Sequence, residues 1–112
     1  MGEGVWIRKH AIIGTNVAIG HYTHIGKKAE IGDTVADLYG VSIGDWSSIG
    51  KHTTIGFNVL VGHYTTVRKK VRIGNLVTIG DYVYIGKKAE ICDGTVIPDY
   101  SVIPPNTKVG CP

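Results

Sequence analysis

The 112-residue sequence has no apolar run long enough to cross a membrane, few cysteines and prolines, and almost no excess of charge. A membrane-spanning helix needs about 20 apolar residues in succession, and the N-terminal stretch MGEGVWIRKH lacks the apolar centre of a signal peptide. A net charge of +3 does not favour nucleic-acid binding unless the lysines cluster in space. We therefore expect a cytoplasmic protein with neither membrane nor nucleic acid as its partner.

Chain length and composition favour one folded domain that covers residues 1–112. A chain of this size suits a single hydrophobic core. Hydrophobic residues make up 43% of the sequence and are spread along all of it, which argues against disorder. The two cysteines, Cys92 and Cys111, do not make a metal-binding pattern on their own, and in a reducing compartment we expect them to be thiols.

What the sequence does contain is a repeat of six residues that begins at Ile7 and continues to the end. Every sixth residue from Ile7 to Val109 gives eighteen positions, of which seventeen are Ile or Val and one is Asp37. Gly follows twelve of the eighteen, and the fifth position of each hexad is always Ala, Val, Ser or Thr. Two inward positions two residues apart fit a strand and not a helix, so each hexad predicts a short strand and a bend. Stacked bends make a β-solenoid, in which we expect no hexad to carry an insertion.

This repeat resembles that of the hexapeptide-repeat superfamily over essentially the whole chain. The resemblance implies an all-β fold, a single-stranded left-handed parallel β-helix of about six triangular coils with eighteen residues in each. It also implies a homotrimer, because members of the superfamily are usually trimers.

Residues eighteen apart are then expected to stack in columns along the solenoid. One column reads His10, Lys28, Trp46, Tyr64, Tyr82 and Tyr100. A second corner carries Lys51, Lys69 and Lys87 beside His52, Lys70 and Lys88. Stacked aromatic rings favour a structural role over ligand binding. The lysines are typical of a solvated face, with anion binding as the alternative. By the same spacing, the repeated word IGKKAEI at Ile25 and Ile85 is expected on two different faces.

A third corner is predicted to form the contact between subunits, because it mixes apolar residues with little charge. It contains Tyr22, Tyr39, Phe57 and Leu76, and the strand after it contains Trp6, His24, Leu60 and Val96. The irregular segment 35–41 places Asp37 in an inward slot. We expect Asp37 to turn outward through a bulge, with Leu38 or Tyr39 filling its volume.

One stretch, VLVGHYTTVRK, resembles the zinc-binding context of the γ-class carbonic anhydrases. His63 matches the first histidine of that motif, but the second falls on Arg68, and the third position, two coils before His63, falls on Lys27. A protonated guanidinium cannot replace an imidazole at zinc. We therefore expect no metal.

The stretches AIGHYTHIG around His21 and LVGHYTTV around His63 resemble the active-site context of sugar-modifying acyltransferases in the superfamily. The resemblance implies His63 as the general base, a groove between subunits for a small-molecule ligand, and acyl-coenzyme A as the donor. Histidine suits this task because it takes up and returns protons near neutral pH. The lysines Lys51, Lys69 and Lys87 are candidates to hold the phosphates of the coenzyme.

A non-enzymatic trimeric scaffold or binding module is the alternative function. The repeat has no long loop to cover an acceptor, and active sites need a means of excluding water and fixing geometry. Function in solenoid proteins generally resides in insertions or in a specialised face.

Overall fold

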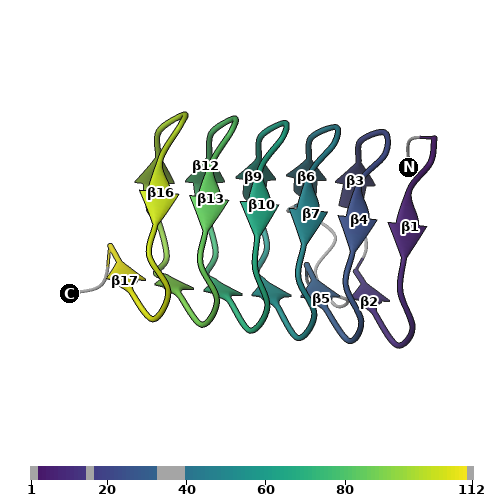
Figure 1. The fold of residues 1–112 in the computed structure, drawn as a ribbon, viewed down its shortest axis with the longest axis horizontal. Helices are drawn as coiled ribbons and strands as arrows, with labels where there is room; N and C mark the ends of the chain where they lie inside the picture. The colour runs from purple at the N-terminus through teal and green to yellow at the C-terminus, as the bar shows by residue number, and fades with distance from the viewer. Residues whose placement is uncertain (1–2, 15–16, 33–39, 111–112) are drawn as a thin grey trace.

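The computed structural model describes residues 3–14, 17–32 and 40–110, which contain seventeen short strands and no helix (Figure 1). All strand pairs are parallel, and they form three sheets. Sheet 1 contains β1 (Trp6–Ile7), β4 (His24–Ile25), β7 (Ser48–Ile49), β10 (Thr66–Val67), β13 (Tyr84–Ile85) and β16 (Val102–Ile103). Sheet 2 contains β2 (Ile12–Ile13), β5 (Glu30–Ile31), β8 (Thr54–Ile55), β11 (Arg72–Ile73), β14 (Glu90–Ile91) and β17 (Lys108–Val109). Sheet 3 contains β3 (Val17–Ile19), β6 (Val41–Ile43), β9 (Val59–Val61), β12 (Thr78–Ile79) and β15 (Val96–Ile97).

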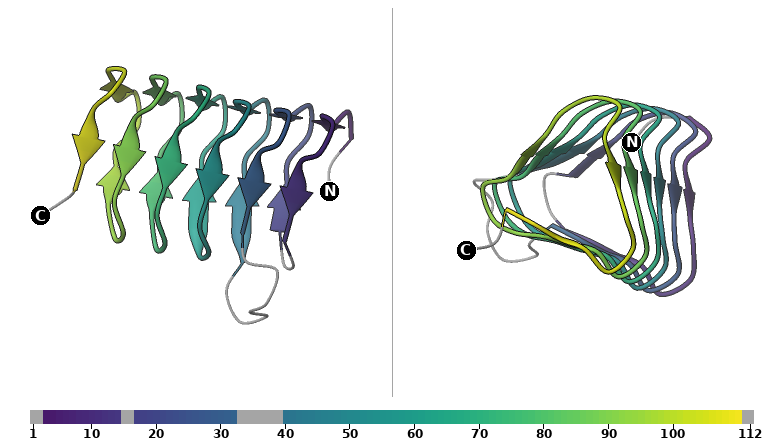
Figure 2. Two further views of the ribbon diagram at one scale, coloured as in Figure 1. Left: turned by 90° about the horizontal axis from the view of Figure 1, so that it is seen from below. Right: turned by 60° about the vertical axis from the view of Figure 1, so that its left-hand side comes forward.

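The three sheets are the sides of a triangular prism, as the view along its length shows (Figure 2). The repeated Ile and Val side chains point inward, and those of the central coils are almost completely buried, as Ile25, Ile49 and Ile85 illustrate. Burial of these side chains is the main stabilising term, because about 25 cal/mol is gained per Å² of apolar surface removed from water. The predicted all-β, left-handed parallel β-helix is confirmed, and three strands per coil give between five and six coils.

One expectation about the repeat is wrong, because the chain does contain an insertion. Most register partners are eighteen residues apart, such as Ile7 and Ile25. Across one point, however, the partners are 24 residues apart, as between Ile25 and Ile49 in sheet 1 and Glu30 and Thr54 in sheet 2. The chain therefore has six extra residues between β5 and β6. The segment with Asp37, Leu38 and Tyr39 falls there, and residues 33–39 lie outside the described residues.

The 24-residue step changes which side chains stack, and it redefines the three corners. We call the bend from sheet 3 to sheet 1 the aromatic corner, the bend from sheet 1 to sheet 2 the basic ridge, and the bend from sheet 2 to sheet 3 the third corner. At each bend a backbone N–H of one coil donates to a carbonyl of the coil before it, for example Tyr64 N to Asp45 O at 3.0 Å. These bonds fix the stacking of side chains along all three corners.

Cys92 is disulfide-bonded, so the expectation of a reduced thiol is wrong for this residue. Cys111 lies outside the described residues. No helix in the described part of the chain is long and apolar enough to cross a membrane.

Candidate functional site

Five aromatic side chains stack along the aromatic corner from the second coil to the last. The ring centres of Tyr22 and Trp46 are 4.5 Å apart, and those of Trp46 and Tyr64 are 6.4 Å apart. Tyr64, Tyr82 and Tyr100 continue the stack at 5.0 and 5.2 Å, with nearly parallel planes. Neighbouring rings cover each other's faces, so this geometry fits a structural role. The predicted column is wrong in its first members, because Tyr22 and not Lys28 precedes Trp46.

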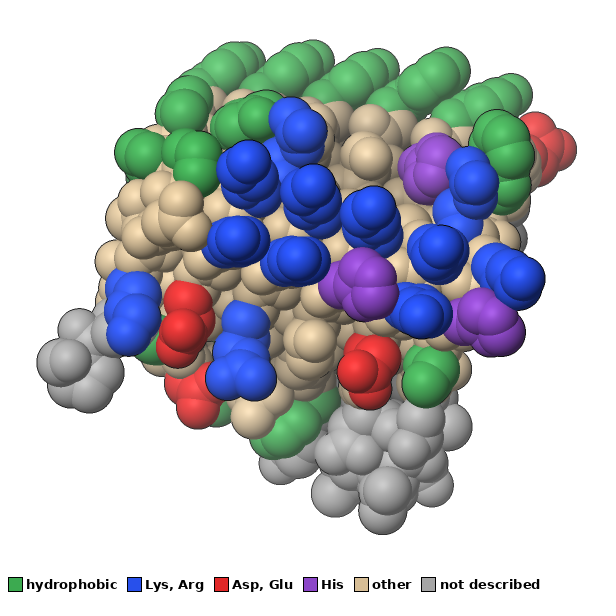
Figure 3. All heavy atoms as spheres, turned by 60° about the horizontal axis from the view of Figure 1, so that its bottom comes forward, with side chains coloured by type: hydrophobic (Ala, Val, Ile, Leu, Met, Phe, Trp, Pro, Cys, Tyr) green, Lys and Arg blue, Asp and Glu red, His purple; other side chains and the backbone are tan. Residues whose placement is uncertain are grey.

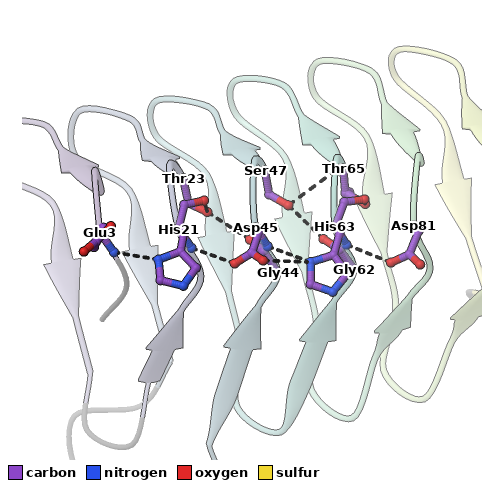
Figure 4. Close-up of polar contacts among 10 residues, drawn as sticks. All are labelled: Glu3, His21, Thr23, Gly44, Asp45, Ser47, Gly62, His63, Thr65 and Asp81. Carbon is purple, nitrogen blue, oxygen red and sulfur yellow. Dashed lines mark hydrogen bonds and ion pairs between the residues drawn. The ribbon is translucent and has the colours of Figure 1, made fainter.

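A polar column lies immediately beside the aromatic stack, and each of its side chains holds the backbone of the coil before it (Figure 4). The bonds run from Glu3 N to His21 Nδ1, from His21 N to Asp45 Oδ1, from Asp45 N to His63 Nδ1, from His63 N to Asp81 Oδ1 and from Asp81 N to Asp99 Oδ1, all between 2.7 and 2.9 Å. Histidine and aspartate therefore perform the same structural task at successive coils.

The candidate base His63 has an exposed ring whose two nitrogens differ. Nδ1 accepts the N–H of Asp45 at 2.8 Å and lies 3.9 Å from Asp45 Oδ2. A neutral imidazole that accepts at Nδ1 carries its proton at Nε2. In Figure 4 the second ring nitrogen points away from these partners. To accept a proton at Nε2, the neutral ring must carry its own proton on Nδ1. It then loses the hydrogen bond from Asp45 N, and Nδ1–H can donate to the Asp45 carboxylate instead.

Buried hydroxyl groups fix the backbone beneath His63. Thr65 Oγ1 donates to Gly80 O at 2.8 Å, and Ser47 Oγ donates to Gly62 O at 2.8 Å. Both side chains occupy the small fifth position of a hexad and are almost fully buried. A buried hydroxyl without a partner would destabilise the fold, so these bonds explain why Ser and Thr are accepted in the core. They hold the bend that carries His63 in one conformation.

The basic ridge contains ten of the twelve Lys and Arg residues and no Asp or Glu. Its cationic and histidine residues are Arg8, Lys9, His10, Lys27, Lys28, Lys51, His52, Arg68, Lys69, Lys70, Lys87 and Lys88. Backbone bonds from Lys28 N to Lys9 O and from His52 N to Lys27 O bring the first coils into this column. The two IGKKAEI words therefore lie on the same ridge, and the prediction that they lie on different faces is wrong.

Charge is strongly segregated on this surface. Figure 3 shows a band of Lys and Arg side chains bordered on one side by hydrophobic side chains. Among the described residues, no Lys or Arg of the ridge forms an ion pair. Repulsion from Lys51 and Lys87 lowers the pKa of Lys69. Desolvation together with Lys28 and Lys51 lowers the pKa of His52. The ridge therefore carries a positive potential that an anion can compensate.

We expect Lys69→Gln to raise the midpoint of thermal unfolding at neutral pH and low salt. The pKa of Lys69 is lower in the folded than in the unfolded chain, so its charged form destabilises the fold at every pH below the folded pKa. Stability lost in this way returns as the pH rises from the folded pKa toward 10.5. Thermal scans at several salt concentrations check this, since screening should shrink the gain. A lower midpoint at low salt would contradict it.

The structure brings Lys51, Lys69 and Lys87 together in one column but places His63 at a different corner. His63 precedes β10 and Lys69 follows it, so the two lie at opposite edges of the outer face of sheet 1. Six residues of extended chain span at most about 20 Å. Within one chain, a ligand that reaches both must lie along this face.

The zinc-type residues are also placed differently from the prediction. The position two coils before His63 is occupied by His21 and not by Lys27, because of the 24-residue step. Arg68 Nη1 donates to the hydroxyl of Tyr84 at 2.8 Å. No group of three His, Cys, Asp or Glu residues placed to hold a metal occurs among residues 3–14, 17–32 and 40–110.

The predicted subunit contact divides over four surfaces. Phe57 and Leu76 lie at the third corner, and Leu60 and Val96 lie on the adjoining sheet 3. Leu60, Leu76 and Val96 are more than half exposed, and a hollow of about 590 Å³ lies beside Leu60 and Leu76. The remaining described members lie elsewhere: Tyr22 is in the aromatic stack, and Trp6 and His24 are on sheet 1. The original grouping is therefore wrong for these three residues.

Comparison with known proteins agrees with the fold. A family model described as bacterial transferase hexapeptide (six repeats) matches residues 52–87. No curated protein matches the chain by sequence. The hexapeptide match over residues 52–87 agrees with the left-handed β-helix fold.

Two solved structures illustrate the likeness in fold. One is a point mutant of AntD, an N-acyltransferase from Bacillus cereus, in complex with dTDP-4-amino-4,6-dideoxyglucose and coenzyme A. It is 18% identical with a TM-score of 0.66, over 99% of this chain and 78% of that one. The other is a hexapeptide transferase family protein from Anaplasma phagocytophilum, 22% identical with a TM-score of 0.56, over 95% of this chain and 70% of that one.

Proposed function

We propose that the protein transfers an acyl group from a coenzyme A-type thioester to a hydroxyl or amine, with His63 as general base. The observation that carries the proposal is the outer face of sheet 1, which has the exposed His63 at one edge and Lys51, Lys69 and Lys87 at the other. A donor with phosphates at one end and a thioester at the end of a flexible arm fits this separation. AntD, which shares the fold, is an N-acyltransferase crystallised with coenzyme A.

In this proposal His63 Nε2 removes a proton from the attacking hydroxyl or amine. The oxygen or nitrogen then forms a bond to the thioester carbonyl carbon, the carbon–sulfur bond breaks, and the proton passes from His63 to the leaving thiolate. When the ring turns away from Asp45 N, Nδ1–H donates a hydrogen bond to the Asp45 carboxylate, which now lies 3.9 Å from Nδ1. The lysines hold the phosphates by charge-assisted hydrogen bonds.

Calorimetric titration with acetyl-coenzyme A tests the donor part of the proposal. We expect saturable binding that weakens as salt is raised, because the contacts to phosphate are ionic. No heat of binding at millimolar ligand would exclude the acyltransferase. Free coenzyme A serves as the control ligand, since it retains the phosphates but lacks the acyl group.

A non-enzymatic binding module is the second candidate, and one observation favours it. The Nδ1 bond of His63 to Asp45 N has the same form as the bond that Asp99 Oδ1 accepts from Asp81 N. Aspartates in other coils accept the same backbone hydrogen bond, so this structural role is sufficient to explain a histidine at position 63.

We further propose a homotrimer whose subunits meet through the third corner and sheet 3. Leu60, Leu76 and Val96 expose apolar surface there, which an interface removes from water. Leu60→Glu is expected to convert trimer to monomer in analytical ultracentrifugation. The matched control is Val102→Glu on sheet 1, which is also more than half exposed and should leave the mass unchanged. An unchanged mass for Leu60→Glu would place the interface elsewhere.

A further inference from the structure

The outer face of sheet 1 is hollowed at one place beside the basic ridge. The outward side chains along this sheet are Trp6, His24, Ser48, Thr66, Tyr84 and Val102. Ser48 is the smallest of them. In its coil and in the coil before it, the first residue after the strand is a glycine, Gly50 and Gly26. These small residues leave a cavity of about 400 Å³ between larger neighbours.

Three cationic side chains from three successive coils surround this cavity. Arg8, Lys27 and Lys51 line it, together with the imidazole of His24 and the hydroxyl of Ser48. No Asp or Glu is among the lining residues. The cavity therefore presents N–H and O–H donors and a concentrated positive charge, which is the chemistry that binds phosphate oxygens.

Aromatic contacts support one wall of the cavity. The Arg8 guanidinium carbon lies 5.2 Å from the centre of the Trp6 ring, and that ring stacks on His24 at 5.4 Å. A cation held over an aromatic face loses less conformational freedom when it binds a ligand. Arg8 and His24 are thus positioned before a ligand arrives.

The next arginine along the ridge does not create a second cavity of this kind. Arg68 Nη1 donates to Tyr84 Oη at 2.8 Å, and its guanidinium carbon lies 6.0 Å from the centre of the Tyr84 ring. Where Ser48 leaves space, Thr66 and Tyr84 place larger side chains on the sheet. The hollow is therefore local and not a general property of the ridge.

We propose that this cavity binds a pyrophosphate group. Near neutral pH a free pyrophosphate carries roughly three negative charges and the diphosphate diester of a coenzyme roughly two, so either compensates most of the three cations, whereas a single carboxylate would leave two uncompensated. The group can be a free anion or the diphosphate of a coenzyme or nucleotide. The site stands whether or not the protein transfers acyl groups, because no step of its argument uses His63.

Inorganic pyrophosphate, titrated by calorimetry at low and at physiological ionic strength, is the probe. We expect Ser48→Tyr to weaken binding by about tenfold or more, because the ring fills the cavity without changing any charge. A tyrosine is tolerated on this row, as Tyr84 shows. Thr66→Tyr, one coil later and outside the cavity, is the matched control and should change affinity less than about threefold.

Charge variants separate a site from diffuse attraction along the ridge. Lys27→Gln removes a lining cation and is expected to weaken binding by about tenfold, whereas Lys88→Gln removes an equal charge three coils away and should have little effect. Equal losses in these two variants, or unchanged affinity in Ser48→Tyr, would overturn the proposal.

Competition with coenzyme A identifies the source of the group. Displacement of pyrophosphate by coenzyme A assigns the cavity to a coenzyme's diphosphate. Independent binding of the two assigns it to a free anion or another diphosphate. The first result supports the site as part of donor binding, and the second supports it as a separate site. Failure of acetyl-coenzyme A to bind at all, with pyrophosphate still bound, would remove the proposed acyl transfer and leave the cavity proposal intact.

Discussion

His63→Asn is expected to reduce acyl transfer by about 10²–10⁴-fold while leaving the fold intact. Asparagine has no group that takes a proton near neutral pH, but its side-chain oxygen can accept the N–H of Asp45 as His63 Nδ1 does. The third corner contains the precedent, since Asn75 Oδ1 accepts the N–H of Phe57 at 3.0 Å. Steady-state rates with acetyl-coenzyme A, measured beside thermal unfolding, check both parts.

Two comparisons make this experiment decisive. His21→Asn makes the same exchange at a position that holds the Glu3 N–H, and it should change neither rate nor stability by much. His63→Ala removes the acceptor altogether and should also cost about 1 kcal/mol of stability. If His63→Asn keeps its full rate, the histidine is only a structural acceptor and the non-enzymatic module becomes the better function.

Imidazole nitrogen resonances offer a readout that does not depend on turnover. The structure requires the proton of neutral His63 on Nε2, because Nδ1 accepts from Asp45 N. The proposed base requires the opposite tautomer, with Nδ1–H facing the Asp45 carboxylate. A change of tautomer when an acceptor and a donor analogue bind would support catalysis.

The fold could be predicted from the sequence because the positions of the repeat are the positions that point into the core. Strand alternation places Ile or Val inward at every sixth residue, and these are the residues that the structure buries. An α-helix, with its period of 3.6, does not accommodate a strict period of six. The same Ile and Val residues are therefore buried whatever the number of hexads in each coil.

The columns could not be predicted from a uniform spacing of eighteen residues, because stacking depends on the number of hexads in each coil. An insertion of six residues preserves the inward pattern while it moves every later residue to the next corner. Asp37, the one repeat position that is not Ile or Val, indicates where the insertion lies. Two pairs of similar residues, Tyr22 with Trp46 and Lys27 with Lys51, are 24 residues apart. A single spacing of 24 residues at that place predicts the full ridge and puts His21 in the column of Asp45 and His63.

The sequence could predict that Asp45 is the neighbour of His63, but not which atoms of the two residues are in contact. Asp45 is eighteen residues before His63 in the regular part of the solenoid, so the two could be assigned to one column. That Nδ1 accepts a backbone N–H is a property of the bend conformation. It becomes visible only when the side-chain torsions are known.

Gly62→Ala is expected to destabilise the fold by about 2–4 kcal/mol, a fall of roughly 10–20 °C in the midpoint of thermal unfolding. A Cβ at this position would lie 2.5 Å from the carbonyl carbon of Gly80 in the next coil, and closer still to the oxygen of that carbonyl and to Asp81 Oδ1. The same carboxylate oxygen accepts the N–H of His63. The methyl group would therefore separate two coils and disturb the bend that carries the candidate base.

Gly94→Asn is the control for that experiment, because it also adds a side chain at a bend but meets no neighbour. Nothing lies within 4 Å of a Cβ built at Gly94, and its φ is +74°. Asparagine tolerates this left-handed conformation, and Asn58 adopts it, with φ of 55°, two coils earlier in the same column. We expect a change below about 1 kcal/mol. Equal destabilisation by the two variants would mean that glycine is needed for chain flexibility at the bends, and that contact between coils is not the cause.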